Sequence, residues 1–243
     1  MDCNEKIDFS KNYKIIDIEL DQLSEERNAF IEFTNRIEEL HSEAPVISKN
    51  KEYFVENSAD TNTSKRIKKI YAKTVLNMSH YEEIYDETIP ENMIYELGYD
   101  LYLAIDGASS LNSYLKNSLI SAGTDAAHRR KQFKNIIKKE KKRISEFSRP
   151  LFSLCNEIFV LKANSNSLNI YTQLEELLIQ CENIAMKRQK QIRSRRSVAS
   201  QFYNGDFEEY LYSDLSNQYP ILSLVSEFIA TIKNILATKE GGV

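Results

Sequence analysis

The chain has 243 residues, of which 42% are hydrophobic and 28% charged, and it carries a net charge of −4. With only 6 Gly and 4 Pro it has few residues that interrupt helices, and its apolar fraction is large enough to bury a core. This composition excludes wholesale disorder and leaves little room for β-sheet, so we expect an all-α protein.

Charge is unevenly distributed along the chain. Residues 1–107 hold 12 Lys and Arg against 23 Asp and Glu, and residues 197–243 hold 2 against 6. Residues 108–196 reverse the balance, with 18 basic residues against 7 acidic ones. A basic segment of this kind meets either an external polyanion or the acidic part of its own protein, and the pattern leaves both open.

The first part of the chain is predicted to be a series of helices. Apolar residues at alternating steps of four and three predict an acidic helix over residues 13–41. Pro45 and the polar run that follows it predict a long loop over residues 42–63, and residues 64–107 are expected to return to helix.

Local signals place one helix start within this part. Thr88 and Glu91 fit a capping box, with Pro90 near the first helical position. Gly98 is expected inside the helix that follows.

The middle of the chain, residues 110–200, predicts a long antiparallel hairpin of two helices. A four-three apolar stripe runs from Leu115 to Leu161, and only Arg129 and Glu140 within it are charged. Pro150 falls inside the stripe and is expected to kink or break the helix, because its ring clashes with the preceding turn and it has no amide hydrogen.

The hairpin also predicts where its basic residues lie. Asn164–Ser167 forms the expected turn, and a second stripe follows from Tyr171 to Ile192. Arg143 and Lys187 are each about 22 residues from the turn, so at about 1.5 Å per residue the two basic runs reach the same height.

The C-terminal part, residues 206–238, is predicted to form the last helices. Asp206 is expected to cap one of them and Pro220 to open the other. These elements together predict one helical domain over residues 1–243, an elongated all-α bundle built around a coiled-coil-like hairpin.

Cysteine usage and hydropathy bear on the compartment. Cys3, Cys155 and Cys181 are too few and too far apart for a disulfide framework or a Cys-based zinc site, and we expect Cys155 and Cys181 to be buried as small apolar residues. The chain starts without the basic and apolar regions of a leader, and no window approaches 18 uncharged apolar residues. We therefore expect a cytoplasmic protein with no transmembrane segment.

Histidine spacing raises the alternative of a ferritin-like metal protein. Each histidine has a carboxylate three positions away, as such bundles use in their di-iron sites. These pairs are Glu38 with His41, His80 with Glu83, and Asp125 with His128. Such neighbours also arise by chance in a chain this rich in carboxylates, so we predict surface or capping pairs and assign no metal ligand.

Catalytic motifs are absent from the sequence. It contains no phosphate-binding glycine loop, no H-E-x-x-H and no G-x-S-x-G. We predict a protein that is not an enzyme, with no cofactor, no catalytic residue and no small-molecule substrate.

The basic runs supply the candidate interaction patch. It comprises Arg129, Arg130, Lys131, Lys134, Lys138, Lys139, Lys141, Lys142, Arg143, Lys187, Arg188, Lys190, Arg193, Arg195 and Arg196. The favoured hypothesis is a protein-interaction or scaffold module in which this patch meets the acidic helix over residues 13–41, another protein or a second copy. The alternative is a surface for a polyanion, either nucleic acid or an anionic membrane, held mainly through phosphate contacts.

One stretch of sequence resembles a known family. The residues that carry the resemblance are Tyr71-Ala72-Lys73-Thr74-Val75, His80-Tyr81-Glu82-Glu83-Ile84-Tyr85-Asp86-Glu87, Glu91-Asn92 and Glu96-Leu97-Gly98. They look like a helical family of haloarchaeal proteins known only as a domain of unknown function, and a weaker similarity continues to about Arg196. The resemblance implies an archaeal, cytoplasmic, helical protein and brings no assigned catalytic residue with it.

Overall fold

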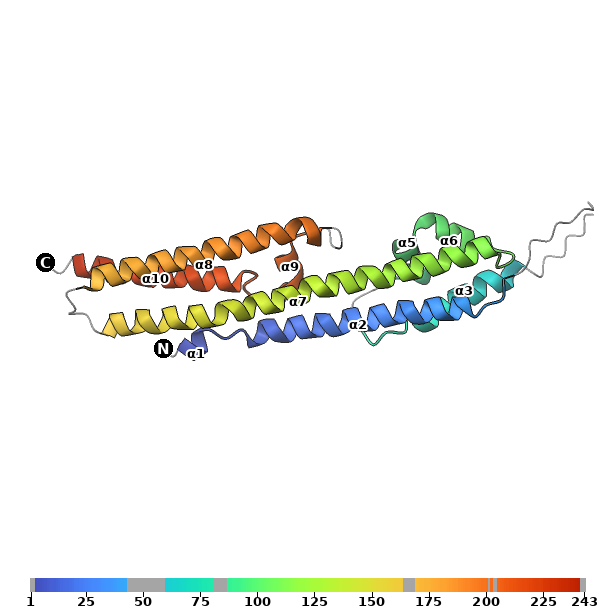
Figure 1. The fold of residues 1–243 in the computed structure, drawn as a ribbon. Helices are drawn as coiled ribbons and strands as arrows, with labels where there is room; N and C mark the ends of the chain where they lie inside the picture. The colour runs from blue at the N-terminus through green and yellow to red at the C-terminus, as the bar shows by residue number, and fades with distance from the viewer. Residues whose placement is uncertain are drawn as a thin grey trace, which may run out of the picture. The chain divides into compact units, whose positions relative to one another are not determined.

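The computed structural model describes residues 3–42, 60–80, 87–163, 169–200, 202 and 205–240, and within these ranges the secondary structure is helical (Figure 1). The expected all-α class is confirmed. The helices are α1 (Cys3–Lys6), α2 (Ser10–Glu38), α3 (Asp60–Thr74), α5 (Ile89–Leu97), α6 (Tyr99–Asp106), α7 (Ser113–Ala163), α8 (Ile170–Ala199), α9 (Phe207–Leu211) and α10 (Pro220–Glu240).

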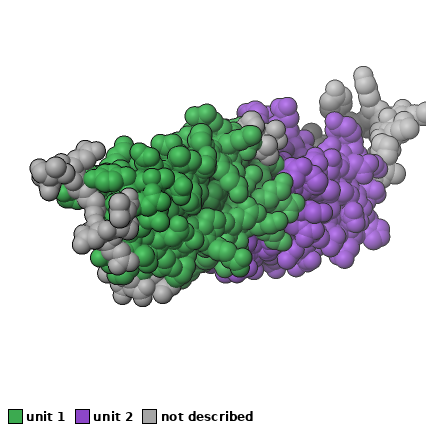
Figure 2. All heavy atoms as spheres, turned by 60° about the vertical axis from the view of Figure 1, so that its left-hand side comes forward, with its two compact units in different colours: residues 1–19, 135–243 green, residues 20–134 purple. Residues whose placement is uncertain are grey.

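The chain divides into two compact units, which Figure 2 colours separately. Unit 1 contains residues 1–19 and 135–243, and unit 2 contains residues 20–134. Helices α2 and α7 each contribute residues to both units.

Unit 1 is built from the C-terminal part of α7 together with α8 and α10. The ammonium of Lys187 on α8 lies 5.4 Å from the centre of the Phe147 ring on α7, and α8 packs along α10 (Figure 1). The apolar stripes of these helices form the core of the unit. Its most deeply buried members include Ile137, Ile144, Leu151, Leu174, Cys181, Ile221, Val225 and Ile232.

The N-terminal segment joins this unit on two sides. Cys3 of α1 forms a disulfide with Cys155 of α7. Lys6 of α1 makes a 3.4 Å ion pair with Glu227 of α10, and its ammonium lies over the neighbouring Phe228 ring. The expectation that Cys155 is a simple buried thiol is therefore wrong, because it is both buried and bonded, whereas Cys181 is buried with a free thiol as expected.

Unit 2 has its own core around aromatic residues of α2 and α3. The ring of Tyr71 packs edge-on against Phe33 and Phe30, and its hydroxyl donates a 2.6 Å hydrogen bond to the Asn92 side chain. A Cβ at Gly123 of α7 would lie 2.7 Å from the Thr34 hydroxyl of α2. Glycine at this position thus permits the close approach of the two helices.

Three of the expected helix starts are confirmed. Thr88 and Glu91 form the capping box, with Pro90 in the first turn of α5. The Asp206 carboxylate caps α9 by accepting from the Glu208 amide, and α10 begins at Pro220.

Two expectations about helix interruptions differ from the structure. Gly98 does not lie inside a helix but separates α5 from α6, with a φ of 94° that favours glycine. Helix α7 is not broken at Pro150 and continues to Ala163, so the expected break is wrong, whereas the alternative of a kink stays a prediction.

Other predictions fall partly outside the described residues. Residues 43–59 of the expected loop and residues 164–168, which hold the expected hairpin turn, lie outside them. The expected end of that loop at residue 63 is wrong, because residues 60–63 belong to α3. The antiparallel hairpin over residues 110–200 stays a prediction. The acidic helix expected over residues 13–41 is α2, which runs from Ser10 to Glu38.

Candidate functional site

Two arginines of the predicted patch are buried in unit 1. Arg188 is 1% exposed and Arg195 4% exposed, and both project from α8 toward the carboxylates of Glu140 on α7 and Glu208 on α9. The Arg188 guanidinium donates to both Glu140 oxygens, at 2.6 and 3.1 Å. Arg195 donates to Glu140 and to Glu208. We call these four residues the unit 1 charge network.

Burial and pairing together set the ionisation of the unit 1 charge network. Burial alone would raise the pKa of Glu140, but the hydrogen bonds and positive charges of Arg188 and Arg195 outweigh it and hold that pKa below its ordinary value. The Tyr212 hydroxyl donates to Glu140 at 3.2 Å, and burial beside this carboxylate raises the pKa of Tyr212. The network therefore pairs two carboxylates with two guanidinium groups, and Glu140 is held in its ionised form.

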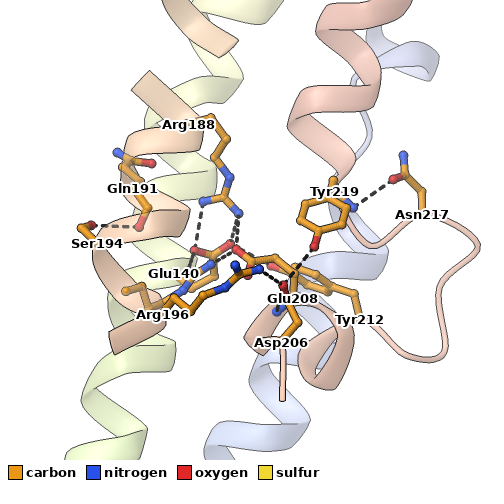
Figure 3. A network of polar contacts seen from close by, with 11 residues as sticks. Glu140, Arg188, Gln191, Ser194, Arg196, Asp206, Glu208, Tyr212, Asn217 and Tyr219 are labelled. Atoms are coloured by element: carbon orange, nitrogen blue, oxygen red, sulfur yellow. Dashed lines mark hydrogen bonds and ion pairs between the residues drawn. The ribbon is translucent and has the colours of Figure 1, made fainter. Parts of the chain in front are cut away.

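Further polar contacts surround the network at its more exposed edge. Arg196 donates to the Asp206 carboxylate at 2.7 Å, and the Tyr219 hydroxyl donates to the same group at 3.3 Å. Figure 3 shows these side chains beside Glu208 and Tyr212. Arg196 is largely exposed, so its pair with Asp206 contributes little to stability.

Unit 2 holds a second group of paired charges, formed by Glu26, Glu96, Arg129, Arg130 and His80. The Arg130 guanidinium donates to Glu26 at 3.0 Å and to Glu96 at 2.7 Å. Burial lowers the pKa of Arg130, but the two carboxylates outweigh burial, so the net direction is upward. Arg129 reaches Glu96 at 3.3 Å, and a ring nitrogen of His80 lies 3.3 Å from Glu26.

Glu25 of α2 contacts the residues that follow α3. Its carboxylate accepts from the backbone amide and the hydroxyl of Ser79, both at 2.8 Å, and these hydrogen bonds lower the pKa of Glu25. The other ring nitrogen of His80 lies 3.3 Å from Glu25. His80 thus contacts carboxylates of α2, while its expected neighbour Glu83 lies outside the described residues.

We expect Arg130→Met to lower the free energy of unfolding by about 2–3 kcal/mol, because Glu26 and Glu96 would remain buried without their main cation. Arg129→Met also removes an arginine that pairs with Glu96, but the Arg129 side chain is 43% exposed. This replacement should therefore lower the free energy of unfolding by less than about 1 kcal/mol. Urea unfolding followed by circular dichroism measures both. Equal effects of the two variants would contradict the role given to Arg130.

The remaining members of the predicted patch have mixed surroundings. Lys134 contacts the Ser24 hydroxyl within unit 2, and Lys141 makes an ion pair with Asp17 within unit 1. Arg143 is half-buried. The exposed members are Lys131, Lys138, Lys139, Lys142, Lys187, Lys190, Arg193 and Arg196.

One part of the patch prediction is therefore wrong. Arg188 and Arg195 are not accessible to a partner, because they neutralise buried glutamates of their own unit. The sequence periodicity indicates that both arginines are buried. The buried face of α8 follows steps of seven, four and three through Cys181, Arg188, Ile192 and Arg195.

The paired charges of both units are suited to holding helices together. Both carboxylates of the unit 1 charge network accept hydrogen bonds from guanidinium groups. Such a set adds little net stability, because the loss of hydration of the buried ions offsets their attraction. Among the described residues, no group of three or more His, Cys, Asp and Glu is placed to hold a metal ion.

One segment also resembles a membrane-spanning helix by composition. Pro220–Thr238 of α10 has a mean hydropathy of 1.5 and is long enough to cross a membrane, although core helices of soluble proteins share both properties. In the structure 22% of this segment is buried, including the stripe of Ile221, Val225, Phe228 and Ile232. The expectation of no transmembrane segment stays a prediction.

Comparison with known proteins yields a family and no assigned activity. No curated protein and no solved structure matches the chain. A family model described as Domain of unknown function (DUF7260) matches residues 8–235, which include all of unit 2, most of unit 1 and both sets of buried charges. The match spans most of the chain, and the chain belongs to this family.

Proposed function

We propose that the chain is a non-enzymatic helical module that binds another protein or a second copy of itself. The observation that carries this proposal is a set of large apolar side chains exposed on α7 and α8 within unit 1. Phe159 is 56% exposed, Ile179 57% and Met186 59%, and Phe152, Val160 and Tyr171 are exposed as well. Aromatic residues and methionine are enriched at protein interfaces, where burial against a partner removes them from water.

The buried charges support the same proposal. Arg188 and Glu140 fix α8 against α7 in the unit whose helices carry the exposed apolar residues. A surface on firmly held helices loses little conformational entropy when it binds. The ionisable groups in the interior of unit 1 pair with one another and hold its helices together. This arrangement suits a rigid binding surface better than acid–base catalysis.

Light scattering of the purified chain, joined to a pull-down from the native host, tests this proposal. We expect a dimer or a captured protein for the wild type, and loss of that association in the variant Phe159→Glu/Ile179→Glu/Met186→Glu. The matched control is Asn156→Glu/Gln180→Glu/Gln189→Glu, which adds the same charge at exposed polar positions of α7 and α8 and should retain association. A wild-type monomer that captures nothing would overturn the proposal.

The finer expectations from the sequence stay predictions. They are a haloarchaeal origin, coiled-coil packing of the hairpin and a cytoplasmic location. Polyanion binding by the basic runs also stays an alternative, and its supporting observation is the exposure of Lys138, Lys139, Lys187 and Lys190 in unit 1. Absence of nucleic-acid binding at low salt would remove it.

A further inference from the structure

A second concentration of positive charge lies outside the two basic runs, in a groove of unit 2. The groove has a volume of about 400 Å³ and lies between the end of α2 and the face of α3. Its cationic side chains are Arg36, Arg66, Lys69 and Lys73, and Glu39 is the acidic residue of its lining.

Helix geometry explains why these side chains converge. Arg66, Lys69, Ile70 and Lys73 follow the spacing i, i+3, i+4, i+7, so they share one face of α3. The adjacent face of α3 carries Ile67, which is fully buried in the core of unit 2. The groove face is therefore held in place by core packing.

The charges in the groove are mostly uncompensated. Arg66, Lys69 and Lys73 are exposed and make no ion pair with the residues that the structure describes. Arg36 pairs with Glu32 at 2.7 Å, on the same helix. Three cations without an ion-pair partner among the described residues, gathered in one groove, create a local field that attracts anions.

We propose that this groove binds a small organic anion that carries a diphosphate group. Arginine and lysine are the side chains that best recognise phosphate, arginine through paired hydrogen bonds and lysine as a point charge. Along α3, Arg66 and Lys73 are about 10 Å apart at about 1.5 Å per residue, with Lys69 between them, so their long side chains can converge on one compact anion. Leu40 and Ile70 add an apolar wall for the organic part of the ligand.

Two features favour a small ligand over a polymer. The volume of about 400 Å³ falls in the range of small-molecule sites. Glu39, which is exposed in the lining, places a negative charge where an extended polyanion would have to pass. We therefore assign the site to a compound of the nucleoside diphosphate class.

Calorimetric titration of the full chain with ADP, and separately with inorganic pyrophosphate, tests the site. We expect binding of ADP at low salt, and at least a tenfold loss of affinity in Lys69→Glu/Lys73→Glu. The matched control is Lys65→Glu/Lys131→Glu, which makes the same charge change at exposed positions of unit 2 outside the groove and should bind as the wild type does. The circular dichroism spectrum and thermal midpoint of each variant report on folding.

Several results would overturn the assignment. One is a wild type that binds neither probe at low salt, and another is an equal loss of affinity in the control variant. If pyrophosphate binds as tightly as ADP, the apolar wall contributes nothing to affinity. That result would contradict the assignment to an organic ligand. Tighter binding of a single-stranded oligonucleotide than of ADP, lost in Lys69→Glu/Lys73→Glu, would assign the groove to nucleic acid instead.

Discussion

Replacing Glu140 by Gln should lower the free energy of unfolding by about 3–5 kcal/mol, because Arg188 and Arg195 would remain buried with Glu208 as their one remaining shared carboxylate. Gln has nearly the same shape, so the change removes charge and leaves packing intact. Glu146→Gln is the control, since Glu146 is exposed on the same helix and its replacement should stay within about 0.5 kcal/mol. Urea unfolding followed by far-ultraviolet circular dichroism measures both.

Acidity should reduce the difference between the wild type and Glu140→Gln. The pKa of Glu140 is depressed in the folded chain, so its stabilising contribution is complete above the ordinary carboxyl pKa of about 4.3 and is lost as the pH falls through the folded value. The two chains should converge in stability well below pH 4.3. A difference that stays constant down to the acid limit of folding would contradict the ionised state of Glu140.

A companion variant separates charge from packing in the same network. Replacing Glu140 and Glu208 by Leu, together with Arg188 and Arg195 by Met, removes all four charges at similar volume. Such apolar replacements of buried ion pairs are often neutral or stabilising. Recovery of stability in this variant would show that the loss in Glu140→Gln comes from unpaired buried charge.

Reducing the Cys3–Cys155 disulfide should destabilise unit 1 by up to about 5 kcal/mol, because the bond closes a loop of about 150 residues and removes chain entropy from the unfolded state. Cys155→Ser should show the same loss without any reductant. Urea unfolding with and without dithiothreitol measures the effect.

Replacing either cysteine of the disulfide provides the control for this prediction. Cys155→Ser and Cys3→Ser should be equally unstable, and neither should respond further to reductant. Burial raises the pKa of Cys181 to about 11, so this thiol is not expected to exchange with the disulfide. A denatured wild type that titrates as three free thiols before any reduction would contradict the bond.

The disulfide also weighs against one expectation from the sequence. Structural disulfides persist mainly in oxidising compartments, and the cytosol of most organisms keeps thiols reduced. A cytoplasmic location was expected from the absence of a leader pattern, which carries no information on redox state. Fractionation of the native host, with alkylation of free thiols at lysis, would measure location and bond together.

Helices and their ends followed from local rules. The spacing of Ile221, Val225 and Ile232 places the buried stripe of α10, and Asp206 and Thr88 mark helix starts through hydrogen bonds made within three residues. Each of these signals is contained in a short window of sequence. Such windows are what periodicity and capping rules describe.

Contacts between distant residues were not accessible in the same way. Glu140 stands out in the apolar stripe of α7, yet its partners are 48 and 55 residues away. Cys3 and Cys155 are separated by 152 residues, and no local rule pairs them. The net charge of residues 1–107 does not indicate the groove on α3. Its lysines lie in a segment that is acidic overall, with 12 basic residues against 23 acidic ones.

The spacing of the two buried arginines also fixes the register of α8. Arg188 and Arg195 are seven residues apart, close to two helical turns, so both reach the carboxylates of Glu140 and Glu208 from one face. Sliding α8 by one turn would place a guanidinium against apolar residues such as Ile144 and leave a glutamate unpaired in the core. The four buried charges thus specify the register of α8. Apolar stripes alone do not, because they tolerate a shift by one turn.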